Sequence, residues 1–143
     1  MITLRLPCPP SMNTYWRNFR GRTVLSKKGR EFKQLVQEYV IDNQVPKFGD
    51  QRLSVIMVFR PRDKRVCDID NRIKPVLDAL QDAGVYDDDS QIDHLEMSRG
   101  LHLKGGGIVV FIGVIKPHQL SGESLPSAQL GTSEADELSS LTL

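Results

Sequence analysis

Two aspartates one residue apart, followed by a lysine, form the segment of this sequence best suited to chemistry. Asp68 and Asp70 stand just before an expected helix, and Lys74 follows four residues later. Alternate side chains of an extended chain point the same way, so both carboxylates would face one site while Ile69 points towards the core. Lys74, about one helical turn further on, would reach the same site. Such oxygen ligands suit Mg²⁺, which binds through a few carboxylates and substrate phosphate.

A third carboxylate is expected from the acidic run Asp87, Asp88 and Asp89. The intervening helix of about 12 residues spans roughly 18 Å, so a strand must run back alongside it to bring one of these aspartates to the pair. Simpler explanations fit the same residues, because Asp70 is placed to cap the helix and an acidic run also suits a solvated turn. Residues 87–93 lack the glycine and glutamate of a calcium loop, and residues 104–107 lack the Lys-Ser/Thr of a phosphate loop.

Charge is divided unevenly along the chain, although the net charge is only +1. Residues 1–66 carry an excess of nine positive charges, while residues 67–117 and 118–143 each carry an excess of four negative charges. A basic face attracts phosphates and an acidic centre attracts divalent cations, the combination that a metal-dependent nuclease needs. Ordinary solvated charge would give the same division.

Hydrophobic periodicity predicts a small sheet and two helices. The expected strands are residues 2–6, 22–25, 53–59, 92–99 and 108–115. One helix is expected over residues 26–42, capped by Ser26, and a second over about residues 71–83, ended by Gly84. The first helix should turn one apolar stripe to the core, made of Phe32, Leu35, Val36, Tyr39 and Val40. Residues 11–22 are expected to form a loop. These elements predict an α+β fold (an α/β layer) with two main helices packed on a small mixed β-sheet.

Length and composition fit a single globular domain. The domain is expected over residues 1–117, and residues 118–143, rich in serine, glycine and glutamate, are expected to form a polar, flexible tail. The two cysteines, Cys8 and Cys67, exclude a disulfide scaffold and argue against a structural zinc site. There is no membrane-length apolar run and no signal-peptide pattern, so a cytoplasmic location is expected.

The order and spacing of these motifs resemble a known nuclease family. The matching string is Asp68-Ile-Asp-Asn71, Lys74, Asp78-Ala-Leu80, Ala83-Gly84 and Asp88-Asp-Ser-Gln-Ile92, after an opening of Leu6-Pro-Cys-Pro-Pro-Ser11, Asn13, Tyr15, Arg17 and Gly21-Arg22. Over about residues 2–116 the chain is similar to RusA-type Holliday junction resolvases, the crossover junction endodeoxyribonucleases. Two features depart from that pattern: Met12 stands where an asparagine is common, and the chain extends past Pro117.

The resemblance implies a bacterial or phage-encoded homodimer that acts in DNA recombination and repair. Such enzymes bind four-way junction DNA and, with Mg²⁺ or with Mn²⁺ in its place, nick two strands of like polarity symmetrically. Carried over by position, the catalytic and metal-binding aspartates are Asp68, Asp70 and Asp89, and the catalytic lysine is Lys74. Asp78, one turn beyond Lys74, would orient that lysine or form a plain surface ion pair with it.

DNA contacts are expected from polar and basic residues of the first 65 positions, namely Asn13, Tyr15, Arg17, Arg20, Arg22, Lys27, Lys28, Arg62, Lys64 and Arg65, with Arg30 and Lys33 in addition. Contacts to phosphates position DNA without reading its sequence. Tyr15 or Trp16 would stack on junction bases unless a loop buries the ring. Two other functions stay open: a metal nuclease that prefers flaps or duplex DNA, and a DNA-binding protein without catalysis.

Overall fold

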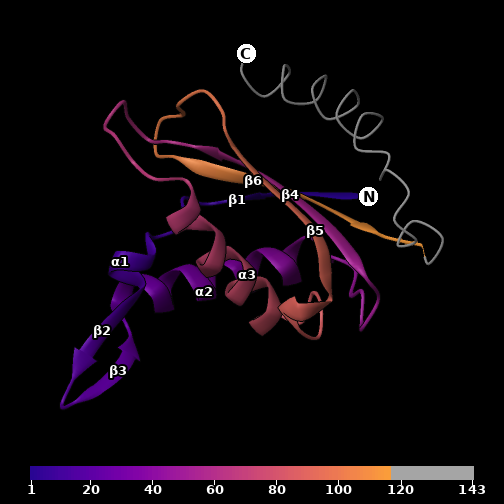
Figure 1. The fold of residues 1–143 in the computed structure, drawn as a ribbon, viewed down its shortest axis with the longest axis horizontal. Helices are drawn as coiled ribbons and strands as arrows, with labels where there is room; N and C mark the ends of the chain where they lie inside the picture. Colours follow the sequence, from indigo (N-terminus) through magenta and orange to yellow (C-terminus); the bar gives the residue numbers. More distant parts are fainter. Residues whose placement is uncertain (117–143) are drawn as a thin grey trace.

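A four-stranded mixed sheet is the centre of the computed structural model, which describes residues 1–116 (Figure 1). Its strands are β1 (Ile2–Leu6), β4 (Leu53–Arg60), β5 (Ile92–Arg99) and β6 (Gly107–Val114). They lie in the order β1-β6-β4-β5, with β4 antiparallel to β6 and parallel to β5. Every residue of β4 is buried, as its largely apolar sequence predicts for a central strand. The last strand begins and ends one residue earlier than predicted.

Two main helices cover one face of this sheet (Figure 1). They are α2 (Lys27–Asp42) and α3 (Ile73–Asp82), and they pack against each other. The hydroxyl of Ser26 caps α2 by accepting a hydrogen bond from the backbone N–H of Gly29 at 3.1 Å. Gly84, with φ of +81°, follows the end of α3 in the left-handed conformation that favours glycine. The predicted α+β fold is therefore confirmed.

The buried face of α2 is narrower than its sequence pattern suggests. Phe32, Val36 and Val40 are buried in the core against the sheet, as predicted. Tyr39 is half-buried, and its hydroxyl accepts a hydrogen bond from the backbone of β1. The prediction for Leu35 was wrong, because this side chain is 48% exposed and lines an open pocket. None of the helices within residues 1–116 is long and apolar enough to cross a membrane.

The segment predicted as a loop over residues 11–22 is ordered, so that prediction was wrong. It forms a short helix, α1 (Met12–Tyr15), and a two-stranded hairpin of β2 (Trp16–Phe19) and the correctly predicted β3 (Arg22–Leu25). The hairpin projects from the body of the molecule (Figure 1). Every residue of β2 is exposed, so no polar–apolar alternation marks it as a strand. The predicted tail, residues 118–143, lies outside the described residues.

Candidate active site

The aspartate segment enters α3 through a turn, which differs from the predicted extended chain. Ile69 has φ of −72° and ψ of −30°, and Asp70 opens a one-turn 3₁₀ helix, η1 (Asp70–Arg72). Asp70 therefore does not cap α3, and the argument from alternating side chains was wrong. Ile69 does pack against the core, as predicted. Asp68 and Asp70 are both exposed, and neither carboxylate has a hydrogen-bond or ion-pair partner among residues 1–116.

Lys74 links the start of α3 to the acidic run. Its ammonium nitrogen lies 2.8 Å from a carboxylate oxygen of Asp89 and 3.0 Å from one of Asp78. The hydrogen bonds to Asp89 and then to Asp78 raise the pKa of Lys74 well above its ordinary value. The lysine is therefore held as a fixed positive charge and is unsuited to act as a general base. Of the three adjacent aspartates, Asp89 is the one paired with Lys74.

The backbone that precedes Asp89 is positioned by Gln91, a buried residue that the sequence reasoning missed. Both residues belong to a second 3₁₀ turn, η2 (Asp89–Gln91), at the start of β5. The side-chain amide nitrogen of Gln91 donates to the carbonyls of Gly49 at 2.8 Å and Gln51 at 2.6 Å. Its oxygen accepts from the backbone N–H groups of Asp87 at 3.0 Å and Asp88 at 2.9 Å. One amide thus ties the acidic run to a neighbouring loop.

Replacing Gln91 by alanine should destabilise the protein by about 3 kcal/mol, because it removes four hydrogen bonds made by one buried side chain. The free energy of unfolding in urea measures this loss. Gln37→Ala, at an exposed position of α2, is the matched control and should change that free energy by less than about 0.5 kcal/mol. An equal, small effect of both substitutions would mean that Gln91 does not hold the acidic run.

The carboxylates match Mg²⁺ in chemical type, although the structure does not gather them into one ligand cluster. Asp68 and Asp70 offer hard oxygen donors that have no partner within residues 1–116. Within residues 1–116, however, no three histidine, cysteine, aspartate or glutamate side chains lie together so as to hold a metal ion. The cation beside Asp89 in this structure is the ammonium group of Lys74.

Most of the residues predicted to contact DNA form two exposed groups. Arg17, Arg20 and Arg22 are on the projecting hairpin, where the first two guanidinium groups stack on the exposed ring of Phe19 at 5.3 and 5.2 Å. The second group lies around the loop after β4 and the start of α2 and comprises Lys27, Lys28, Arg62, Lys64 and Arg65. Asn13 is exposed on α1. Phe19 was missed by the sequence reasoning, and its only signal is its place between arginines.

Three of the residues predicted to contact DNA make contacts within the protein. Tyr15 is fully buried, so the prediction that it contacts DNA was wrong, whereas its neighbour Trp16 is 41% exposed. Lys33 forms an ion pair with Asp82 that joins α2 to α3. The Arg30 guanidinium donates to the carbonyl of Leu25 at 2.8 Å and so fixes the end of the hairpin.

Comparisons with known proteins identify the family of this chain. The family model for endodeoxyribonuclease RusA matches residues 7–113. The chain belongs to the RusA family. It is 36% identical over 107 residues to the crossover junction endodeoxyribonuclease of Enterobacteria phage HK97, covering 75% of this chain and 89% of the relative. Its identity to the crossover junction endodeoxyribonuclease RusA of Escherichia coli K12 is 32% over 111 residues, covering 77% of this chain and 92% of the relative.

Membership of the RusA family confirms the resemblance stated from the motifs and places this chain in a family of DNA-cutting enzymes. The match includes the aspartate segment, Lys74 and the acidic run. It also includes the projecting hairpin and the basic loop after β4. The candidate active site therefore lies wholly inside the region that defines the family.

Proposed function

We propose that this RusA-family chain is a Mg²⁺-dependent endonuclease that resolves four-way DNA junctions by paired, symmetric nicks. The observation that carries the proposal is Lys74, which follows Asp70 by four residues and pairs its ammonium with Asp89. Asp68 and Asp70, on the same segment, have carboxylates without partners among residues 1–116. The names of the relatives support the junction as substrate. The exposed basic hairpin and loop support a nucleic acid as the ligand.

Asp68, Asp70 and Asp89 are the residues that would hold the metal. The chemistry that Mg²⁺ supplies when bound is a lowered pKa for the attacking water and stabilisation of charge on the phosphoryl oxygens. Lys74 keeps its proton and places a positive charge where negative charge develops during cleavage. Asp78 orients Lys74 from one turn along α3.

A junction with two-fold symmetry needs two active sites related by the same symmetry, so the proposal includes a homodimer. Light scattering should give twice the chain mass of 16.1 kDa. A monomer at the concentrations at which the protein cuts junctions would contradict the paired mechanism, and the nicks would then be independent events.

Substrate choice tests the proposed function against its alternatives. Four-way, three-way, flap and linear substrates with the same arm sequences should be incubated with the protein and Mg²⁺. We expect the four-way junction to be cut fastest, at symmetric positions in two strands of like polarity. Faster cutting of flaps or linear duplex would identify a nuclease of different preference, and tight binding without cutting would identify a DNA-binding protein.

A further inference from the structure

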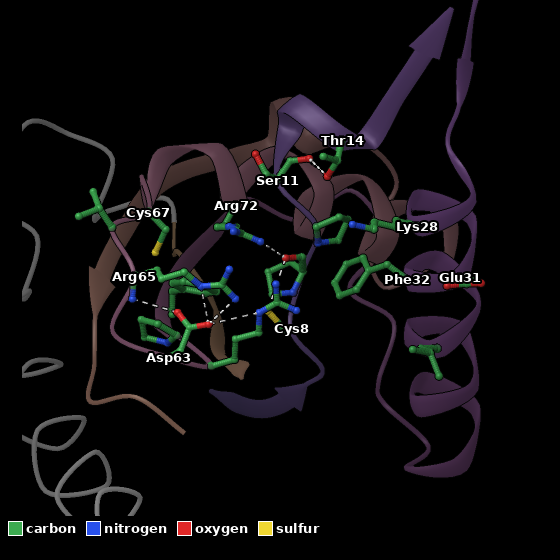
Figure 2. Close-up of a pocket in the computed structure, with 17 residues that line it drawn as sticks. Cys8, Ser11, Thr14, Lys28, Glu31, Phe32, Asp63, Arg65, Cys67 and Arg72 are labelled. Carbon is green, nitrogen blue, oxygen red and sulfur yellow. Dashed lines mark hydrogen bonds and ion pairs between the residues drawn. The ribbon is translucent and has the colours of Figure 1, made fainter. Parts of the chain in front are cut away.

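A pocket of about 480 Å³ extends as far as Cys67 and Arg72, on either side of the aspartate segment in the sequence (Figure 2). It is an open pocket lined by parts of residues 8–14, one side of α2 and the loop that follows β4. Its apolar walls include Pro9, Pro10, Phe32, Leu35, Pro61 and Val66. Cys67 lies in the same wall and is directly followed by Asp68, so the pocket borders the candidate active site in the chain.

Positive charge is in excess around this pocket. Four cationic side chains line it, and only two carboxylates, Glu31 and Asp63, oppose them. Asp63 is already engaged, because Arg65 donates to it at 2.8 and 3.0 Å and thereby lowers the pKa of the aspartate. Lys28 is exposed and has no partner among residues 1–116. The pocket therefore favours an anionic ligand.

Arg72 is the cation best fixed in the pocket, and the sequence reasoning missed it. One terminal nitrogen donates to the carbonyl of Pro9 at 2.5 Å, and the guanidinium lies over the ring of Phe59 at 5.1 Å. These two contacts hold the group in place. Its Nε is buried and has no acceptor in the described structure. Because the Nε is not accessible, a ligand in the pocket would meet Arg72 through the positive charge of its guanidinium.

We propose that this pocket accepts one unstacked nucleotide of the DNA strand that is cut. The base lies against the apolar walls, and its phosphate lies towards Arg72, Arg62 and Lys28. The apolar walls suit the flat face of any base, and the cations suit the anionic phosphate that every nucleotide carries. Removing a base from an intact stack costs a few kcal/mol, and the cost is least where pairing is already disturbed. The strand-exchange point of a junction is such a place, so this inference rests on the proposed function and deepens it.

The test uses a fluorescent adenine analogue, 2-aminopurine, whose emission rises when the base leaves the stack. It is placed singly at each nucleotide around the exchange point of a four-way junction, and the full-length protein is added in EDTA so that the strands stay intact. We expect emission to rise at one position on binding. An abasic nucleotide at that position should weaken binding to the wild-type protein about tenfold, the typical worth of one stacked base.

Variants that fill the pocket distinguish a nucleotide bound in the pocket from DNA bound elsewhere on the protein. Leu35→Trp and Val66→Trp place a large ring at the rim of the pocket, one from α2 and one from the loop after β4. These positions are 48% and 100% exposed, so the fold should tolerate both. Ile41→Trp, at an exposed apolar position further along α2 and outside the pocket, is the matched control. We expect both filling variants to lose the fluorescence rise and to bind the intact and the abasic junction equally, whereas the control behaves like the wild type in both measurements.

The outcomes distinguish the two proposals. A bound junction in which no position responds would overturn the nucleotide pocket and leave the proposed function standing. A fluorescence rise that persists in both filling variants would also overturn it. So would a wild-type protein that binds a junction with the abasic nucleotide as tightly as the intact junction, because the pocket would then contact only phosphate. A wild-type protein that does not bind the junction would overturn the proposed function itself.

Discussion

Replacing Asp70 by asparagine should lower the rate of junction cleavage by roughly 1,000-fold, because a bound metal supplies several kcal/mol of transition-state stabilisation and each 1.36 kcal/mol is worth tenfold in rate. Asparagine keeps the shape of the side chain and removes the charge that attracts the cation. Asp70 is exposed and has no partner among the described residues, so the fold should not depend on it. Single-turnover cleavage of a synthetic four-way junction measures the loss.

Binding should behave differently from cleavage in this variant. Removing a negative charge does not weaken attraction to phosphates, so the affinity for the junction in EDTA should be unchanged or slightly higher. Asp42→Asn, which removes an exposed aspartate at the end of α2, is the matched control and should cleave like the wild type. Cleavage by Asp70→Asn at a near wild-type rate would remove Asp70 from the active site.

Replacing Lys74 by glutamine should lower the cleavage rate about 100- to 1,000-fold, the usual cost of losing one preorganised group that stabilises developing charge. The substitution also leaves the carboxylates of Asp78 and Asp89 without the cation between them. The effect should fall on kcat rather than on junction affinity. Lys104→Gln, in the exposed turn before β6, removes an equal charge away from the site and should leave kcat unchanged.

The pH dependence of cleavage tests the role assigned to Lys74. The two carboxylates raise its pKa, which means that the folded protein holds the proton more tightly than a free lysine does. The ammonium is therefore fully charged between roughly pH 6 and pH 9, below the ordinary lysine pKa of about 10.4. The pH–rate profiles of the wild type and of Lys74→Gln should therefore show the same ionisation steps in this range. A step that is lost in the variant would show that Lys74 titrates and acts as an acid or a base.

Elements with one strong periodic face could be predicted from the sequence. The segment Leu53–Phe59 is apolar except for Ser54 and forms most of the buried central strand β4. Ser26 followed by an apolar helical stripe predicted α2 and its cap. Both elements owe their stability to burial, and burial leaves a periodic signature in the residue types.

Features held by single polar contacts could not be predicted in the same way. The β2–β3 hairpin is exposed, so it lacks the alternation that marks a half-buried strand. The turn at Ile69 changes the direction of the two carboxylates, and no residue type in this segment predicts a turn. Gln91 and Arg72 act through backbone carbonyls that lie far from them in the sequence. The choice of Asp89 among three aspartates came from the family motif, and the structure pairs that same residue with Lys74.

Cleavage of a synthetic four-way junction, measured side by side in Mg²⁺ and in EDTA, tests the proposed active site most directly. We expect paired nicks at symmetric positions in Mg²⁺ and intact strands in EDTA, with the junction bound in both. Junctions that are bound but stay intact in Mg²⁺ would contradict the account, as would nicking that proceeds equally in EDTA.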